Sequence, residues 1–254
     1  MLEKVDLTKK ISKEEYKAKM PQMEIELGRL QRECRELKIP VMIVFEGFGA
    51  SGKGVQIGKL IQSMDPRGFQ VFPIKAETED ERMHPFLWRF WTKTPEAGRI
   101  AIFDGSWYRK VLIDRFEKRT REKEIETAFH SIEAFEKQLT DGGTILVKLL
   151  LDIDQKEQKK RFEKLLEKKE TAWRVSQGDR ERNAKYSEYA AMMEEVLYRS
   201  DTKSAPWTVI EATDRRFATV KIYMTVIHAL AEAVEAVQRR RMDCLLYTSP
   251  SPRD

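Results

Sequence analysis

Residues 41–54 read VMIVFEGFGASGKG, and the fold of the chain follows from this stretch. Five apolar and largely β-branched residues run into a glycine-rich turn, and the amphipathic run VQIGKLIQSM follows at 55–64. Gly47, Gly52 and Lys53 match the pattern G-x-x-x-x-G-K, in which backbone amides surround phosphate oxygens and the lysine contacts the outer phosphates. A strand before the turn and a helix after it predict a phosphate-binding loop formed by Gly47, Gly49, Ser51, Gly52, Lys53 and Gly54. The alternative is a glycine-rich turn without a ligand.

Runs typical of strands recur along the rest of the chain. Besides 41–45, short apolar runs predict strands at 70–74, 100–103, 144–151 and 207–210. Helical periodicity fills the intervals, and Ser12 with Glu15 predicts a capping box before a long first helix, which Pro40 ends. Strands that alternate with helices predict βαβ units, and hence an α/β fold with a five-stranded parallel sheet covered by helices on both faces.

The composition is that of a globular protein. Its 254 residues are 41% hydrophobic and 35% charged, which suits one large domain with its own core. No apolar run approaches the length that spans a bilayer, and the N-terminal stretch is charged throughout, so it does not read as a secretion signal. We therefore expect a cytoplasmic protein that does not associate with membranes.

The last eleven residues, CLLYTSPSPRD at 244–254, resemble a sequencing-library adapter translated in frame. The alternative is a natural disordered tail, which the Ser-Pro composition also suits. On either interpretation we expect one domain over 1–243 and no structure from 244 on. On the adapter interpretation, the natural protein continues beyond about Asp243, and Cys34 is the single cysteine, so no internal disulfide can form.

Positive charge is concentrated in two segments of a chain whose net charge is +5. Residues 155–185 contain eleven Lys or Arg and six acidic residues, and residues 109–123 contain seven and three, which gives net charges of +5 and +4. Such runs are often solvated helix faces, but beside a phosphate loop they favour a polyanionic ligand. Within the first segment, residues 163–185 lack any strand signal and predict a mobile helical lid over the carboxyl edge of the sheet.

The loop lacks the hydroxyl that usually contributes to magnesium binding, because Gly54 stands where Ser or Thr is usual. Asp104 ends the apolar run IAIF, a position from which its carboxylate can reach a loop-bound Mg²⁺ directly or through water. Asp104 is therefore the candidate metal ligand. Its alternative role is to cap the following helix.

Four segments together resemble the polyphosphate kinase 2 family. They are the loop, AETEDERMHPFLWRF (76–90), IFDGSWYRKVLIDRF (102–116) and APWTVIEATDRRFA (205–218), and the resemblance covers nearly all of residues 1–240. The opening looks most like that of the tandem-domain polyphosphate:AMP phosphotransferases, of which this would be the first domain. The resemblance implies a P-loop kinase fold similar to that of thymidylate kinase, with a helical lid. It also implies Mg²⁺ as cofactor and phosphoryl transfer between polyphosphate and AMP or ADP.

The resemblance also implies roles for individual residues. The catalytic candidates are Lys53, Asp104 and Arg109. The residues that match the basic helix and the lid, and that would contact polyphosphate, are Arg115, Trp173, Arg174, Arg180 and Arg182. The residues on the nucleotide side are His84, Trp88 and Arg89, and for Trp88 a core role is an equal alternative.

Two motifs depart from the family pattern. The family loop usually has Asp where this chain has Gly49, and the strand motif usually has Arg where it has Gly105. Together with Gly54, these glycines remove a carboxylate, a guanidinium and a hydroxyl from the site. Since the loss of one such contact commonly lowers a rate by ~10² to 10³, the loop is expected to bind phosphate but to catalyse its transfer poorly.

Several hypotheses follow for the whole domain. The first is a catalytically weakened N-terminal half of a tandem polyphosphate:AMP phosphotransferase. The alternatives are a domain active by itself, in which Asp104 and Glu46 hold Mg²⁺, a non-catalytic polyphosphate-binding or assembly module, and an NTP-linked nucleotide kinase. Nucleic-acid binding has little support, because the basic segments lack interleaved aromatic residues. A homo-oligomer or a fused second copy is expected, and the acceptor base stays open.

Overall fold

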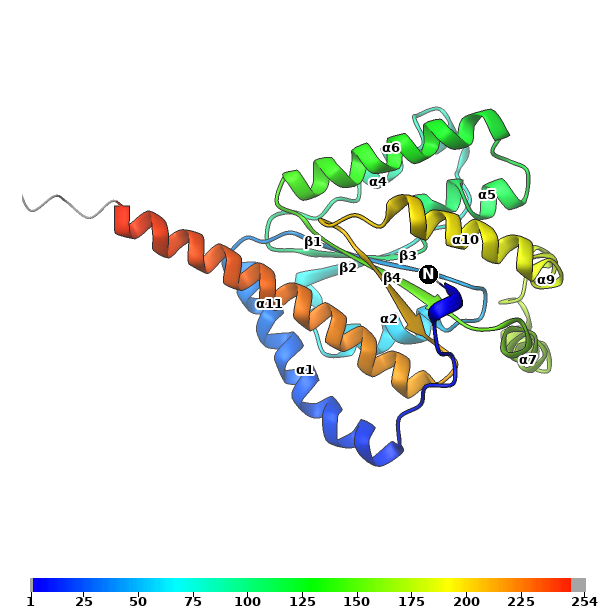
Figure 1. The fold of residues 1–254 in the computed structure, drawn as a ribbon, viewed down its shortest axis with the longest axis horizontal. Helices are drawn as coiled ribbons and strands as arrows, with labels where there is room; N and C mark the ends of the chain where they lie inside the picture. The colour runs from blue at the N-terminus through cyan, green and yellow to red at the C-terminus, as the bar shows by residue number, and fades with distance from the viewer. Residues whose placement is uncertain (1, 248–254) are drawn as a thin grey trace, which may run out of the picture.

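The computed structural model describes residues 2–247, and five parallel strands form a single sheet at its centre (Figure 1). The strand order is β2-β3-β1-β4-β5, so β1 and the loop that follows it lie in the middle of the sheet. All five predicted strands are confirmed, as is the parallel α/β fold. The strands are β1 Val41–Gly47, β2 Phe69–Pro73, β3 Ile100–Asp104, β4 Ile145–Asp152 and β5 Trp207–Glu211.

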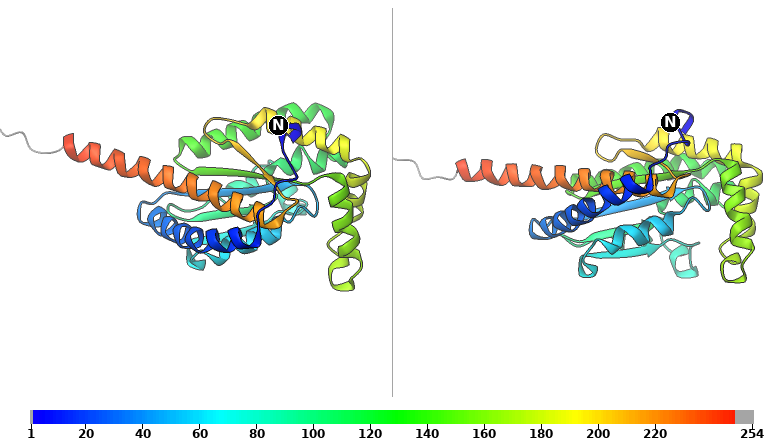
Figure 2. Two further views of the ribbon diagram at one scale, coloured as in Figure 1. Left: turned by 60° about the horizontal axis from the view of Figure 1, so that its bottom comes forward. Right: turned by 90° about the horizontal axis from the view of Figure 1, so that it is seen from below.

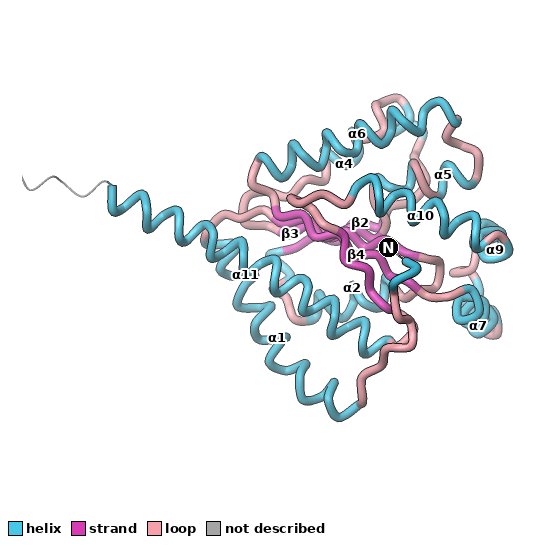
Figure 3. The backbone as a smooth tube through the Cα atoms, viewed as in Figure 1, coloured by secondary structure: helices cyan, strands magenta, loops and turns pink. Residues whose placement is uncertain are grey.

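Helices cover both faces of this sheet, which Figure 3 shows edge-on between them. On one face α11 packs against α1, α2, β4 and β5, and on the other α6 contacts β4 and α10. The longer helices of these layers are α1 Lys13–Glu36, α2 Lys53–Gln62, α6 Glu122–Asp141, α10 Tyr186–Ser200 and α11 Arg215–Tyr247. The shorter segments are η1 Leu2–Lys4, η2 Pro66–Gly68, α3 Glu79–Arg82, α4 Trp88–Trp91, η3 Trp107–Lys110 and α5 Ile113–Phe116.

The predicted capping box starts α1. Ser12 Oγ accepts a hydrogen bond from the Glu15 amide at 3.0 Å, and the Glu15 carboxylate accepts one from the Ser12 amide at 3.3 Å. The helix ends at Glu36, before Pro40, and Lys38 adopts a left-handed φ of 60° in the turn between them. Pro40 therefore follows a turn that has already ended the helix.

One charged side chain lies in the middle of the core. Lys148 on β4 is fully buried, and its Nζ donates to Glu136 Oε2 on α6 at 2.7 Å and to the Ser200 carbonyl at 2.6 Å. The other carboxylate oxygen of Glu136 accepts hydrogen bonds from Trp107 Nε1, at 2.9 Å, and from the Tyr108 hydroxyl. This cluster ties β4, α6, α10 and η3 together beneath the sheet.

The lid segment is helical, as predicted, and contains no strand. Its helices are α7 Gln155–Leu166, α8 Lys169–Ala172 and α9 Gln177–Ala184, so it begins at the end of β4 rather than near residue 163. Figure 2 shows α7 projecting from the body of the domain beside the carboxyl edge of the sheet.

Helix α11 corrects two expectations. Within the described residues, it is long and apolar enough between Arg215 and Met242 to pass a composition test for a membrane span, because its charges gather near its two ends. Half of the most apolar 18 residues in that stretch are buried in this domain, as is usual for a core helix. The helix also runs to Tyr247, into the segment expected to be unstructured, because no Gly or Pro interrupts it before Pro250. The remainder, 248–254, lies outside the described residues.

Candidate functional site at the carboxyl edge of the sheet

The predicted phosphate loop begins where β1 passes closest to β4. Gly47 has a φ of 137°, and a Cβ on it would lie 2.3 Å from the carbonyl oxygen of Leu151. Only glycine fits this position, because a side chain would collide with backbone. The next amide, that of Phe48, donates to the same Leu151 carbonyl at 3.3 Å, so the loop leaves the sheet tied to β4.

The loop turns its amides toward an open space at the start of α2. Ser51 N donates to the Phe48 carbonyl at 3.1 Å, whereas the amides of Ala50, Gly52, Lys53 and Gly54 donate no hydrogen bond to any described part of the protein. Free amides at a helix N-terminus, together with the helix dipole, form an anion-binding site. The Ser51 hydroxyl is also buried without a hydrogen-bond partner in the described structure. The geometry is that of a phosphate cradle.

Lys53 lies at this cradle and supplies its cation. Its Nζ donates to the Gly47 carbonyl at 2.9 Å, which folds the side chain back over the loop. The ammonium also acts on Glu46, whose pKa is raised by burial and lowered in part by the charge of Lys53. A phosphate entering the cradle would therefore meet a lysine that is already in place.

Two carboxylates lie beside the cradle. Asp104, at the end of β3, pairs in register with Phe45 of β1, and its Oδ2 lies 3.9 Å from a Cβ built on Gly54. Glu46 is buried and accepts a hydrogen bond from the Ser106 hydroxyl at 2.7 Å. Asp104 thus faces the start of α2, whereas Glu46 lies beneath the site.

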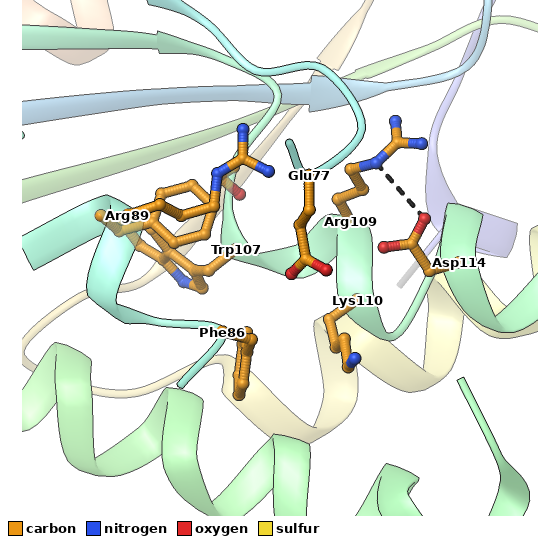
Figure 4. A pocket seen from close by; sticks show the side chains of 9 residues that line it. Glu77, Phe86, Arg89, Trp107, Arg109, Lys110 and Asp114 are labelled. Atoms are coloured by element: carbon orange, nitrogen blue, oxygen red, sulfur yellow. Dashed lines mark ion pairs between the residues drawn. The ribbon is translucent and has the colours of Figure 1, made fainter. Parts of the chain in front are cut away.

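A small pocket next to the cradle is lined by cations from η3 and α4. Figure 4 shows Arg89, Arg109 and Lys110 around it, with Glu77 between them. Arg109 Nε lies 3.3 Å from Asp114, yet this atom and the Nε of Arg89 are buried and make no well-formed hydrogen bond within the described residues. Both guanidinium groups lie beside a carboxylate, Glu81 for Arg89 and Asp114 for Arg109, but their Nε hydrogen bonds are not well formed, which suits a pocket that receives an anionic group.

The residues assigned to the lid and the basic helix separate into two groups. Arg182 is buried and pairs with Glu117 at 2.7 Å and with Asp179 at 2.8 Å, and Arg115 pairs with Glu195 at 2.6 Å. These two guanidinium groups hold helices together in this structure. The other three residues, Trp173, Arg174 and Arg180, are exposed. The two arginines among them form no ion pair with other described residues.

The nucleotide-side residues form two contacts. His84 stacks on Trp88, with ring centroids 4.0 Å apart and an interplanar angle of 15°. His84 is exposed and Trp88 is half-buried, so Trp88 is not a core residue. Arg89 is buried, with its Nε 3.2 Å from Glu81. Of these three residues, Arg89 is the one that lines the pocket.

Comparison with known proteins agrees with this geometry. A family model described as polyphosphate kinase 2 matches residues 10–239. The chain belongs to the polyphosphate kinase 2 family. A polyphosphate:AMP phosphotransferase of Pseudomonas syringae pv. tomato is 36% identical to it over 233 residues, which cover 92% of this chain and 47% of the relative.

Two solved structures described as polyphosphate kinase 2 are similar throughout the fold. One, from Pseudomonas aeruginosa, has a TM-score of 0.89 and 35% identity and covers 92% of this chain and 51% of its own. The other, from Arthrobacter aurescens, has a TM-score of 0.85 and 30% identity and covers 91% of this chain and 85% of its own. The P-loop kinase fold of this polyphosphate kinase 2 domain is thereby confirmed. The chain spans about half the length of the Pseudomonas relatives.

The three glycines that depart from the family pattern differ in their surroundings. A Cβ on Gly49 would lie 3.0 Å from Asp179 Oδ1 and 3.1 Å from the ring of Phe162, so the lid occupies the space of a side chain there. Gly105 has a φ of 76°, which a residue with a Cβ rarely adopts. A side chain at Gly54 would meet only Asp104 within 4 Å. Of the three positions, Gly54 accepts a side chain most readily.

Few protein groups at the site could bind a metal ion, which fits a metal ion bound mainly by the phosphates of the substrate. The described residues contain no group of three or more His, Cys, Asp or Glu arranged to hold a metal ion. Among the described carboxylates, Asp104 faces the start of α2 and Glu46 lies beneath the loop. Asp179 of the lid lies beside Gly49, but it is paired with Arg182 at 2.8 Å. Mg²⁺ is commonly bound by one or two carboxylates, several waters and substrate phosphates, so this set suffices when phosphate is present.

A carboxyl group at the root of the lid makes stability depend on pH. Asp152 ends β4 and is 4% exposed, and burial, with the nearby Asp154 carboxylate, raises its pKa to about 6. The folded state therefore binds this proton more tightly than the unfolded state, whose value is 3.8. The contribution of protonated Asp152 to stability is therefore present at low pH and is lost as the pH rises from about 4 to about 6.

Asp152→Asn is therefore expected to stabilise the domain at pH 7.5, by up to about 3 kcal/mol at ~1.4 kcal/mol per pKa unit. Urea unfolding at pH 5 and pH 7.5 measures the change. The control is Asp154→Asn, because Asn can still cap α7 by accepting the hydrogen bond from the Glu157 amide, which Asp154 accepts at 2.7 Å, and only the smaller effect of the Asp154 charge on Asp152 is removed, so a smaller stabilisation is expected. Equal stability of Asp152→Asn and the parent at pH 7.5 would contradict the prediction.

Some residues of the site were not among the candidates from the sequence. Glu77 and Lys110 line the pocket, and Gln158 and Arg161 of α7 reach the loop from outside. Lys110 follows Arg109 in the basic segment, so that charge run was a usable signal. Arg161 also lies in the basic segment 155–185, but the sequence does not show that its partners, like that of Gln158, are backbone carbonyls distant in sequence.

Proposed function

We propose that this domain transfers the terminal phosphoryl group between inorganic polyphosphate and an adenine nucleotide, with Mg²⁺ as its metal. The free amides of the loop, with Lys53 at their centre and Asp104 facing Gly54, are the observation that carries this proposal. The names of relatives support the substrates, since they include polyphosphate:AMP and ADP-polyphosphate phosphotransferases.

In this proposal, two neighbouring sites position the reactants. The loop amides and Lys53 hold the end of the polyphosphate chain, and Arg89 with Arg109 receives the phosphate of the acceptor nucleotide. The terminal P–O bond of the chain breaks as an acceptor phosphate oxygen forms a new bond to the same phosphorus. The protein supplies positioning and positive charge and needs no covalent nucleophile. When bound, Mg²⁺ would neutralise charge on the phosphate oxygens.

We further propose that this copy of the domain is catalytically weak and supports a second copy in a tandem protein. Glycine at 49, 54 and 105 leaves fewer groups to stabilise charge on the transferred phosphoryl. Lid side chains fill the space beside Gly49, and the carboxylate among them, Asp179, is paired with Arg182 at 2.8 Å. The alternative is a domain that binds polyphosphate without turnover.

The test uses the full chain with polyphosphate, AMP and Mg²⁺, and follows ADP by chromatography. We expect slow ADP formation that Asp104→Asn lowers by ~10² or more. Binding of polyphosphate without any ADP supports the non-catalytic module, and ADP formed only when ATP replaces polyphosphate supports an NTP-linked kinase. A chain that neither binds polyphosphate nor forms ADP would exclude the proposal. Sequencing the complete reading frame tests the tandem arrangement.

Adding a hydroxyl at the open glycine is expected to strengthen metal binding. In Gly54→Ser the new side chain would lie next to Asp104 Oδ2 and add an oxygen ligand where the loop has none. We expect the Mg²⁺ concentration for half-maximal phosphate binding or ADP formation to fall by roughly tenfold. Gly58→Ser is the matched control, because Gly58 lies one turn further along α2 with no atom near a built Cβ. An unchanged Mg²⁺ dependence in Gly54→Ser would contradict this prediction.

A further inference from the structure

Helix α7 contacts the phosphate loop from its outer side through two side chains. Gln158 Nε2 donates to the Gly49 carbonyl at 3.0 Å. Arg161 Nη1 donates to the carbonyls of Ala50, at 3.1 Å, and Ser51, at 3.0 Å. Three consecutive loop carbonyls therefore accept hydrogen bonds from the first helix of the lid.

The remaining donors of Arg161 extend this contact to a second loop. Its Nη2 donates to the carbonyls of Ala212, at 2.8 Å, and Thr213, at 2.9 Å, in the segment that follows β5. Its Nε donates to Glu157 at 2.7 Å. Each guanidinium nitrogen thus bonds to protein, on a side chain that is 8% exposed. No N–H is left for a ligand, because five hydrogen bonds use the five donors of the group.

These carbonyl bonds determine where the loop amides point. Every peptide bond in the described structure is trans, and a planar trans peptide directs its C=O and N–H to opposite sides. With the Gly49 and Ser51 carbonyls directed at α7, the following amides, those of Ala50 and Gly52, face away from it. These are two of the amides that have no partner among the described residues. In each case, the carbonyl that bonds to α7 and the amide that faces the cradle belong to the same peptide group.

The loop also needs support because its conformation is unfavourable. Ala50 has a φ of 57°, in the left-handed region where a Cβ approaches the backbone closely. Such a residue keeps this conformation only when its surroundings hold it. Arg161 bonds the carbonyl of Ala50 itself and that of the next residue, Ser51, so it supports the strained point directly.

We propose that Arg161, assisted by Gln158, is a positioning residue that holds the phosphate loop in its anion-binding conformation from the side opposite to the phosphate. The proposal rests on the proposed function, since it concerns how the same loop binds polyphosphate. It also couples the lid to the loop: α7 cannot move away without releasing the carbonyls that orient the amides.

The test is the variant Arg161→Lys in the full chain, which keeps the charge but cannot bond four carbonyls. Titration with tripolyphosphate is expected to show at least tenfold weaker binding, and steady-state rates a higher KM for polyphosphate with a smaller change in kcat. In ligand-free protein, the Ser51 amide, which the Phe48 carbonyl holds, is expected to exchange its hydrogen at least tenfold faster. Arg199→Lys is the matched control, since Arg199 pairs with Glu126 and Glu195 on the far side of the sheet from α2.

The outcomes separate this inference from the proposed function. The inference is overturned if Arg161→Lys has the same affinity for tripolyphosphate and the same hydrogen-exchange rate at the Ser51 amide as the parent. The proposed function is not affected by that result. A parent that binds no tripolyphosphate overturns the function, and the Ser51 exchange rate then decides the inference alone. Should Arg161→Lys fail to fold, Gln158→Leu removes the single bond to Gly49, and the expected loss of affinity is several-fold. Unchanged affinity in Gln158→Leu would then refute the inference.

Discussion

Replacing Lys148 with methionine is expected to lower the free energy of unfolding by about 3–5 kcal/mol, a large part of the stability of a typical domain. Lys148 and Glu136 are buried and joined at 2.7 Å. Methionine fills the space of the lysine stem but leaves the Glu136 carboxylate in the core without its cation. The Ser200 carbonyl also loses its donor. Urea unfolding followed by circular dichroism measures the change.

A second substitution separates the charge from the packing. In Lys148→Met/Glu136→Gln the amide oxygen still accepts from Trp107 and Tyr108, while the uncompensated charge is gone. We expect the double variant to recover more than half of the loss. If the double variant is no more stable than Lys148→Met, the loss comes from packing rather than from the isolated carboxylate.

The second large effect is expected at Lys53, where methionine should weaken tripolyphosphate binding by about 100-fold. Hydrogen bonds to charged groups contribute about 1.5–3 kcal/mol, and 1.4 kcal/mol is tenfold in affinity, so losing the cation of the cradle removes about two factors of ten. Among the described residues, Lys53 Nζ makes one hydrogen bond, to the Gly47 carbonyl. The fold is therefore expected to survive the substitution. Calorimetric titration at fixed salt concentration measures the affinity.

Salt and net charge need a control, because any lost cation weakens the binding of a polyanion. Lys59→Met removes the same charge from the same helix, where Lys59 bonds to Tyr16 at 3.2 Å rather than to the loop. The affinity of Lys59→Met for tripolyphosphate is expected to differ from that of the parent by less than about threefold. Similar losses in both variants would show that binding depends on net charge and not on the position of Lys53.

The sequence alone was sufficient to predict the fold. A buried strand has a short apolar run, a helix has a 3.6-residue period, and both are local patterns that survive in any context. For that reason the five strands, the capping box at Ser12 and the phosphate loop from Gly47 to Gly54 were all predictable. The end of α11 was not, because the tail was judged by its composition, although nothing in 244–247 breaks a helix.

The chemistry of the site was predictable only in part. Lys53 and Asp104 lie where their motifs predict, since Lys53 begins α2 after the loop that follows β1, and Asp104 ends β3. Arg115 and Arg182 have the charge that a polyphosphate site needs, but in the folded chain they pair with Glu195, Glu117 and Asp179. A side chain's partner depends on which helices meet, and a count of charges does not contain that information.

By itself, the sequence determined the elements of this protein, the glycine-rich loop and the cations available to it, because these depend on residues adjacent in the chain. Only the tertiary structure decided which cations are free, which lid side chains crowd Gly49, and how Arg161 reaches four carbonyls. The physical reason is that backbone carbonyls are the same in every residue. Their hydrogen bonds leave no mark on the sequence and exist only once the lid, the loop and the last strand are packed together.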